Sequence, residues 1–179
     1  MKPITSVMLA ACCVFALAGC IKDNDFEKGN YGINTPENSP VGVGFPQAPK
    51  KINNITVKNV STPQQFQVAL VNLLSDQPAE QDLHVTLALA PAIVDKYNAE
   101  NNPDIELLPA AAYNIPTTEV VIPKGQRTAT LTLNIPDAAA NLNITKTYGL
   151  GLEISSVKET GVTIAQNFKK ILIGIIIKN

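Results

Sequence analysis

The 179-residue chain contains no tryptophan, a single histidine (His84) and only 5% aromatic residues. Aromatic rings with a polar edge are common contact surfaces at binding sites, and histidine is the commonest metal ligand and proton-transfer group, so both lectin-like and catalytic functions have few side chains available. His84 has no histidine or cysteine at metal-ligand spacing, and the sequence has neither a glycine-rich phosphate loop nor a nucleophile elbow. We therefore expect no cofactor and no metal site.

The sequence also shows no recognisable pattern of two paired catalytic carboxylates. Glycosidases hold two carboxylates several ångströms apart in a cleft, and nothing in the sequence marks such a pair, so we expect the protein not to be an enzyme. Four acidic residues gather near residues 95–106 and could offer oxygen ligands to calcium, but they do not alternate as in an EF-hand loop. A solvated acidic helix end is the favoured interpretation of this group, which comprises Asp95, Glu100, Asp104 and Glu106.

Charge and cysteine are both in short supply. Lysine and arginine number 14 against 15 aspartates and glutamates, a formal net charge of −1, so we expect no nucleic-acid partner. Of the three cysteines, Cys12 and Cys13 lie inside an apolar segment near the start of the chain, which leaves Cys20 alone and excludes a disulfide framework.

The first 19 residues have the organisation of an export signal. Lys2 precedes an apolar run over residues 7–18, which is too short to span a bilayer core of about 30 Å as a helix of roughly 20 residues. The run ends in Leu17-Ala18-Gly19-Cys20, which resembles the bacterial lipobox. We therefore expect residues 1–19 to be a lipoprotein signal peptide and Cys20 to be the lipidated first residue of the mature protein, anchoring it to a membrane.

Residues 20–40 are predicted to be the lipidated cysteine followed by a flexible tether. They are polar, and four glycines and prolines interrupt any regular pattern. Residues 22–25, Lys-Asp-Asn-Asp, resemble the short acidic signal that directs lipoproteins of Bacteroidetes-type bacteria to the outer face of the outer membrane. That resemblance implies an outer-membrane, lipid-anchored protein facing the cell exterior.

From residue 41 onward, apolar residues mostly recur at every second position, which is typical of strands with one buried face. In the segment 83–89 we expect Leu83, Val85, Leu87 and Leu89 to point inward and His84 outward. Pro123-Lys124-Gly125 supplies turn chemistry and predicts a hairpin between its flanking strands. Further strands are expected at residues 54–60, 65–74, 119–122, 129–135, 148–154 and 170–177.

One segment departs from this alternation. Residues 92–100 place Ile93, Val94 and Tyr97 on one helical face, which predicts a short helix over one end or edge of the sheets. Residues 169–177 are almost wholly apolar and predict a strand covered on both faces. Strands joined largely by turns favour an all-β fold for residues 41–179, an antiparallel β-sandwich with one short helix, with an up-and-down barrel as the alternative.

Several separated pieces of the chain resemble a known family. The pieces are Val94, Tyr97-Asn98, Leu108-Pro109, Tyr113 and residues 121–125, followed by an alternating strand. In order and spacing they resemble, over residues 41–177, a Bacteroidetes surface lipoprotein domain of unknown function. The resemblance implies an immunoglobulin-like sandwich of the type found N-terminal to family-18 glycosidase-like and laminin-G-like modules, in proteins encoded beside glycan-uptake machinery. Taken by themselves, Tyr97, Leu108 and Tyr113 are core or helix-packing residues.

Together these features predict a non-catalytic cell-surface lipoprotein that serves as a binding or spacer module in glycan capture and uptake. Exposed tyrosines, Tyr113 and Tyr148, are the candidate ligand-binding residues for a polysaccharide partner. The alternative is a structural or assembly partner of another outer-membrane protein, joined through a strand edge or loops.

Overall fold

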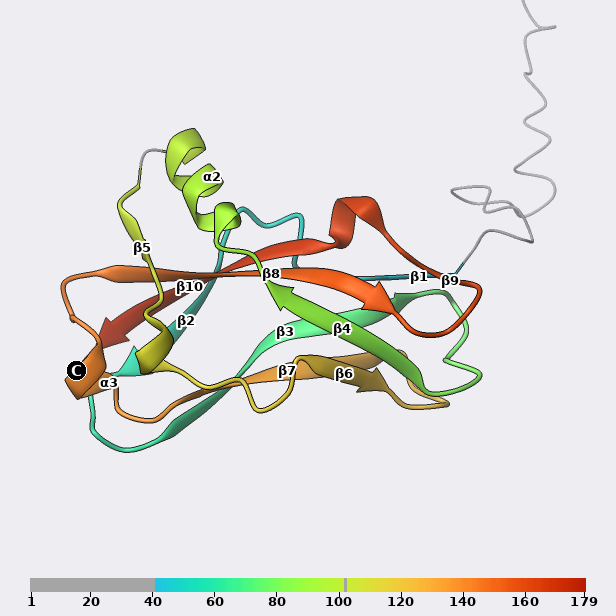
Figure 1. The fold of residues 1–179 in the computed structure, drawn as a ribbon, viewed down its shortest axis with the longest axis horizontal. Helices are drawn as coiled ribbons and strands as arrows, with labels where there is room; N and C mark the ends of the chain where they lie inside the picture. Colours follow the sequence, from blue (N-terminus) through green and yellow to red (C-terminus); the bar gives the residue numbers. More distant parts are fainter. Residues whose placement is uncertain (1–40, 102) are drawn as a thin grey trace, which may run out of the picture. The chain divides into compact units, whose positions relative to one another are not determined.

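The computed structural model describes residues 41–101 and 103–179. These residues form two β-sheets with two short helices, so the predicted all-β sandwich with a short helix is confirmed (Figure 1). The expected signal peptide, lipidation site and tether lie outside the described residues. No helix in the described part is both long and apolar enough to cross a membrane.

The two sheets differ in size and strand order. The four-stranded sheet has the order β7-β3-β1-β9, with β7 (Thr128–Ile135), β3 (Gln64–Leu74), β1 (Val41–Gly44) and β9 (Val162–Ile164). The six-stranded sheet has the order β2-β10-β8-β4-β6, with β2 (Asn53–Lys58), β10 (Lys170–Lys178), β8 (Thr147–Val157), β4 (Leu83–Leu89) and β6 (Glu119–Ile122), while β5 (Ile105–Leu107) pairs with β8. The helical segments are α2 (Ala92–Asn101), the single turn α3 (Ala138–Asn141), and the 3-10 turns η1 (Ala110–Ala112) and η2 (Gln166–Phe168).

Strand direction agrees only in part with the prediction. Most neighbouring strands are antiparallel, but β1 with β9, β2 with β10 and β5 with β8 are parallel. A tight turn joins antiparallel neighbours, whereas parallel neighbours need a crossover. Here the crossovers are long: most of the domain intervenes between β2 and β10, and β6, β7 and α3 lie between β5 and β8. The sandwich is therefore antiparallel in most of its strand pairs, as predicted, with three parallel pairs that the sequence did not indicate.

The core lies between the sheets and is built by alternate residues of each strand. On β4, Leu83, Val85 and Leu87 are buried as predicted, with His84 half-buried on the other face. Leu89 was expected to point inward too, but it is 48% exposed. The reason is that β6 pairs only with residues 83–86, so the end of β4 has no neighbour on that side.

The turn Pro123-Lys124-Gly125 exists, but the predicted hairpin around it is wrong. The strand before it, β6, pairs with β4, whereas the strand after it, β7, pairs with β3 in the other sheet. Gly125 has φ +80°, a conformation that favours glycine. The Asp82 carboxylate accepts a hydrogen bond from Lys124 N at 2.8 Å and Ala79 O accepts one from Gly125 N at 2.8 Å. The turn thus carries the chain from one sheet to the other.

Helix α2 covers the outer face of the six-stranded sheet over β8 and β10 (Figure 1). Glycines on these strands make close approach possible. A methyl group on Gly151 would lie 2.2 Å from Ala90 O, and one on Gly149 would lie 2.9 Å from Ile105 Cγ2. Without side chains at these positions, the backbone entering α2 and the side chain of Ile105 from β5 lie almost directly on the sheet.

Strand β10 confirms the prediction of a strand covered on both faces. Its residues Ile171, Ile173 and Ile175 belong to the main core. On the opposite face Leu172 is 2% exposed and packs with Val94 of α2 and Ile105 of β5. The continuous apolar run of β10 therefore serves two hydrophobic clusters at once.

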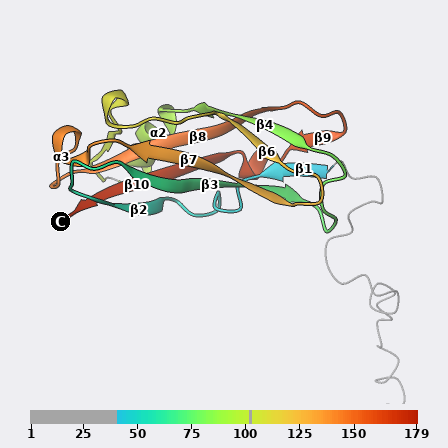
Figure 2. The ribbon, with the colours of Figure 1, turned by 90° about the horizontal axis from the view of Figure 1, so that it is seen from below.

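The chain enters and leaves the described domain at opposite ends of its long axis. Strand β1 begins at one end, where Val41 pairs with Val162, and the C-terminus lies at the other, where Lys178 pairs with Lys58. The two perpendicular views in Figures 1 and 2 agree on this placement.

Candidate functional site

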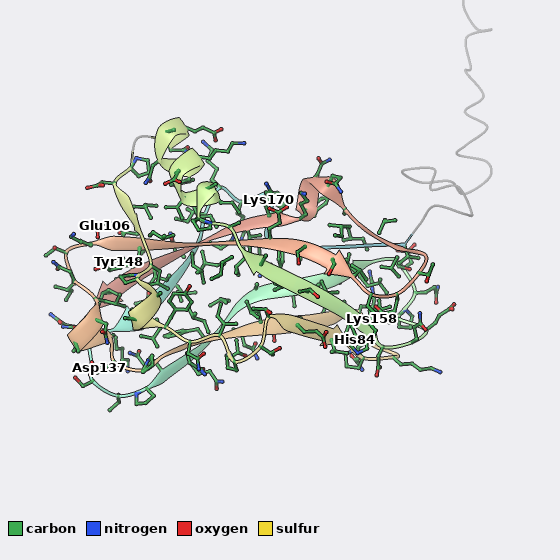
Figure 3. The ribbon with its side chains drawn as sticks, viewed as in Figure 1. His84, Glu106, Asp137, Tyr148, Lys158 and Lys170 are labelled. Carbon is green, nitrogen blue, oxygen red and sulfur yellow. The ribbon has the colours of Figure 1, made fainter. Side chains whose placement is uncertain are left out.

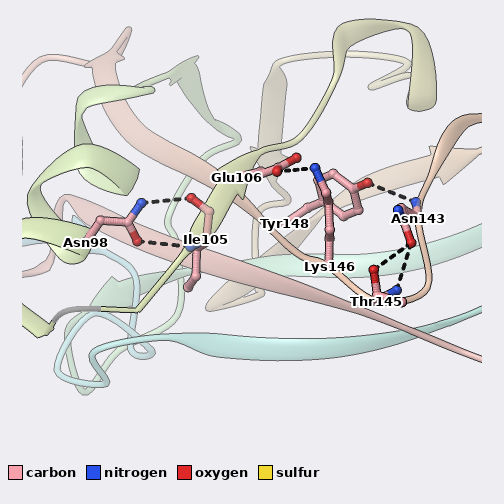
Figure 4. Close-up of polar contacts among 7 residues, drawn as sticks. All are labelled: Asn98, Ile105, Glu106, Asn143, Thr145, Lys146 and Tyr148. Carbon is pink, nitrogen blue, oxygen red and sulfur yellow. Dashed lines mark hydrogen bonds and ion pairs between the residues drawn. The ribbon is translucent and has the colours of Figure 1, made fainter.

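Tyr148, one of the two predicted ligand-binding tyrosines, is buried. It is 4% exposed and shares the core face of β8 with Leu150 and Leu152 (Figure 3). Its hydroxyl oxygen accepts a hydrogen bond from Asn143 N at 2.9 Å (Figure 4). The expected exposure of Tyr148 is therefore wrong, because the alternation of β8 turns this ring inward, where it supports the loop after α3.

Tyr113, the other predicted tyrosine, is half-buried. It follows η1, packs against the main core and lines an apolar hollow of about 280 Å³ that includes Leu89, Leu107 and Pro109. Leu89 and Leu107 are 48% and 50% exposed. Tyr148 borders a different hollow, beside α3, so the structure does not bring the two tyrosines together.

A groove with several charged lining residues, unlike the hollow beside Tyr113, lies beside α2. It has a volume of about 510 Å³ and runs between α2, the loop before β2 and the outer face of the six-stranded sheet. Its charged lining residues come from all three parts: Lys50 and Lys51 from the loop, Lys96 and Glu100 from α2, and Glu153 and Lys170 from the sheet. Together they carry four positive and two negative charges.

Hydrogen bonds fix α2 and so fix one wall of this groove. The Asn98 side chain donates to Ile105 O at 2.8 Å and accepts from Ile105 N at 3.3 Å, pairing with β5 as a neighbouring strand would (Figure 4). At the end of the helix, Lys51 Nζ donates to Asn101 Oδ1 at 2.9 Å, which joins the loop before β2 to α2. The two hydrogen bonds to Ile105 give Asn98, one of the residues that carry the family resemblance, a structural role.

Glu153, at the sheet side of the groove, is held by two lysines. Lys169 Nζ lies 2.9 Å from Glu153 Oε1 and Lys170 Nζ lies 3.3 Å from Oε2. The hydrogen bond from Lys169 is the largest cause that lowers the pKa of Glu153 below its ordinary value of 4.5. The general acid of a glycosidase needs a raised carboxyl pKa, so this environment does not suit Glu153 to that role.

His84 fastens the start of β4 to the loop after β8. Its Nδ1 lies 2.7 Å from Glu159 Oε1, and its backbone N donates to Glu159 Oε2 at 2.8 Å. Burial raises the pKa of Glu159, but these hydrogen bonds outweigh it and the pKa is lowered overall. His84 therefore has a structural partner that sequence spacing did not reveal, because Glu159 lies 75 residues away.

Two of the four acidic residues near α2, Glu100 and Glu106, pair with separate lysines. Glu100 lies 3.7 Å from Lys96, and Glu106 pairs with Lys146, which raises the pKa of that lysine (Figure 4). Within residues 41–101 and 103–179, no three histidine, cysteine, aspartate or glutamate side chains come together as ligands of one metal ion would.

Sequence reasoning identified the helix but not the groove beside it. Lys50 and Lys170 are far apart in the sequence, and Tyr97 was interpreted only as a packing residue, a role it does have against the cluster under α2. The available signal was the adjacent lysine pair at residues 50–51 next to Pro49, which has no partner of opposite charge nearby in the sequence.

Solved structures of Bacteroides proteins share this fold. A candidate carbohydrate-binding protein of Bacteroides ovatus is 19% identical, with 75% of this chain and 36% of that chain covered and a TM-score of 0.58. A Bacteroides thetaiotaomicron endoglycosidase, EndoBT-3987, solved with a Man5GlcNAc product, is 17% identical, with 75% and 30% covered and a TM-score of 0.55. An auxiliary nutrient-binding protein of the same species is 15% identical, with 74% and 46% covered and a TM-score of 0.56.

The chain therefore spans between 30% and 46% of the length of these three proteins. A search of curated proteins finds no match. A family model described as an N-terminal domain matches residues 37–161, well over half of the chain. The chain belongs to this family of N-terminal domains, a Bacteroidetes domain of unknown function.

Proposed function

We propose that this protein is a non-catalytic, lipid-anchored surface module that works in glycan capture and uptake, and that its sandwich acts as a binding or spacer module. The placement of the chain ends carries the proposal: β1 begins at one end of the long axis and β10 ends at the other (Figures 1 and 2). A domain built in this way separates whatever precedes Val41 from whatever is held beyond β10 by its full length.

Two further observations support this function. The family is described as an N-terminal domain, and its structural neighbours include proteins named for carbohydrate or nutrient binding. The groove carboxylate Glu153 is kept ionised by Lys169 and Lys170, which suits a charged binding surface better than acid catalysis.

The anchor in this proposal is Cys20, whose thiol would acquire a diacylglycerol after cleavage behind Gly19. The polar residues 21–40 would then join the lipid to the sandwich on the outer face of the outer membrane. One lipid chain binds a membrane only marginally, whereas two or three hold a protein stably, so the modification suffices for anchoring.

Metabolic labelling with an alkyne fatty acid in a Bacteroides host tests the anchor. We expect the full chain to be labelled, to remain with the membrane fraction and to be removed from intact cells by added protease. The Cys20→Ala variant should be unlabelled, with Cys12→Ala as the matched control that keeps the label. An unlabelled full chain that still begins at Met1 contradicts the proposal.

Retention of polysaccharide by cells tests the capture function. Cells producing the full chain should retain fluorescent polygalacturonate or fluorescent yeast mannan better than cells without it, and the Cys20→Ala variant should abolish the difference. Equal retention of both probes with and without the protein would count against a role in capture.

A second function, assembly with another outer-membrane protein, is favoured by strand β7. This eight-residue strand lies at the edge of the four-stranded sheet, where Asn134 forms an isolated bridge to Asn114, and Thr128 and Thr130 are exposed. Exposed edge strands can pair with a strand of another chain. Cross-linking from a cysteine placed at Thr130 should recover one protein in stoichiometric amount if this function holds.

A further inference from the structure

We infer that the groove beside α2 binds an acidic saccharide, whose sugar rings carry carboxylate groups. The inference rests on the proposed role in glycan capture and adds a site and a ligand class to it. The groove volume of about 510 Å³ falls in the range of ordinary small-ligand sites, about 300–1,000 Å³. A segment of an oligosaccharide therefore fits it without any movement of the domain.

The lining of the groove carries a net positive charge. The whole chain has a formal net charge of −1, yet four lysines and two glutamates line this groove. Glu153 is neutralised by Lys169 and Lys170, and Glu100 lies beside Lys96. The two glutamates therefore do not offset the charges of Lys50 and Lys51.

Lys50 and Lys51 provide the free cationic wall. Among residues 41–101 and 103–179, no carboxylate lies within ion-pairing distance of either amine. Lys51 instead donates to the neutral amide oxygen of Asn101, which holds its amine at the mouth of the groove. A cleft lined by charge of one sign concentrates ligands of the opposite sign.

The groove also offers an apolar surface. Its lining includes the half-buried side chains of Ile93 and Tyr97 and the exposed methyl group of Ala92. A tyrosine ring presents an apolar face and a polar edge, which suits the C–H face and the hydroxyl groups of a sugar ring. Because Asn98 and the glycine contacts hold α2 on the sheet, this surface is already formed before a ligand binds.

A uronate ring matches both features in one compact unit. It places a carboxylate at the edge of a rigid ring that also has an apolar face, whereas an acidic peptide carries its carboxylates on flexible side chains. Binding the rigid unit loses less conformational entropy, which favours the acidic saccharide over the peptide.

Isothermal titration of the full chain with tetragalacturonate tests this inference, with a neutral galactose tetrasaccharide as the comparison. We expect tetragalacturonate to bind at least tenfold more tightly than the neutral sugar, with an affinity that falls as salt is added. The double variant Lys50→Glu/Lys51→Glu should weaken binding by at least tenfold. The matched control is Lys58→Glu/Lys178→Glu, because these two exposed lysines are neighbours in the β2–β10 pair, outside the groove lining.

Three results would overturn the inference: equal binding of the neutral sugar, equal loss in the control variant, or equally tight binding of tetraglutamate. Mannan retention by cells that persists in the Lys50→Glu/Lys51→Glu variant, without tetragalacturonate binding, would overturn the site but leave the proposed function standing. Tetragalacturonate binding that depends on Lys50 and Lys51 in a protein that never becomes acylated would support the site while the proposed anchor fails.

Discussion

The two sheets of the sandwich deal with their outer faces in different ways. On the four-stranded sheet most outward residues of β3 and β7 are polar, and Gln65, Gln67 and Thr130 are exposed. On the six-stranded sheet the outward residues of β8 and β10 include Gly149, Gly151, Leu172 and Gly174, and they are buried under other parts of the chain. One face meets water, whereas the other holds a helix and a groove.

This difference shows how the residues on the outer face of a sheet decide whether a binding groove can form there. A polar outer face presents a flat, solvated sheet, as antiparallel sheets commonly do. A face of glycines and a leucine lets α2 and the loop before β2 lie close to the strands, and the space between them becomes the groove. The glycines thus determine the position of the groove, although none of them lines it.

The largest effect on the difference between the two outer faces is expected from Gly151→Val, which places a side chain on the glycine surface under α2. A Cβ there would lie 2.2 Å from the backbone oxygen of Ala90, so the start of α2 must move, and we expect a loss of about 3 kcal/mol in the free energy of unfolding. Urea unfolding measures it. Thr132→Val, which adds the same side chain to the outer face of β7, should change stability by less than about 0.5 kcal/mol. Equal losses of unfolding free energy in the two variants would show that the two outer faces tolerate an added side chain equally well. If Gly151→Val does not fold, Gly151→Ala takes its place.

A smaller effect is expected from Asn98→Ala. This change removes both hydrogen bonds between the side chain and Ile105, so we expect a loss of about 1–2 kcal/mol, accompanied by faster amide exchange in α2 and β5. Asn134→Ala on β7 is the control, because Asn134 contacts Asn114 through its backbone. An unchanged exchange rate in α2 would mean that packing alone holds the helix on the sheet.

The smallest effect concerns acid. The pKa of Glu153 is lowered by Lys169 and Lys170, so its contribution to stability is present above its ordinary value of 4.5 and is lost as the pH falls through the lowered value. Because the group is partly exposed, we expect less than about 1 kcal/mol. Glu153→Gln should therefore lose less stability than the natural chain between about pH 6 and about pH 3.5, measured by urea midpoints. Glu119→Gln serves as the control, and identical profiles for all three proteins would contradict the assignment.

Long strands could be predicted from the sequence because their alternation extends over many residues. The segment 83–89 matches β4 in both limits, and β3, β7 and β10 match within one residue at each end. The four-residue strand β6 was also predicted, at residues 119–122, because the turn at residues 123–125 marks its end. The short strands β1, β5 and β9 have three or four residues each, too few for a period to appear. The turn at residues 123–125 showed where the chain bends, but turn chemistry contains no information on which strand the next segment joins.

The candidate site was less accessible to sequence reasoning. Tyr148 was expected on the surface, although its spacing from Leu150 and Leu152 already indicated a common buried face. The groove beside α2 draws its lysines from segments around residues 50, 96 and 170, which only the tertiary structure brings together. A local pattern predicts an element, whereas a site built from three distant elements depends on how those elements pack.

The opposite placement of Val41 and Lys178 also decides how the domain responds to tension. A pull along the line joining these two ends acts nearly parallel to β1 and β10, so the hydrogen bonds that join β10 to β2 and β8 are loaded together in shear. Strands peeled from one end lose their bonds one at a time, whereas sheared strands must lose many at once. We therefore expect a pull between these two ends to unfold the domain only at a higher force than a pull that peels β10 away from one end.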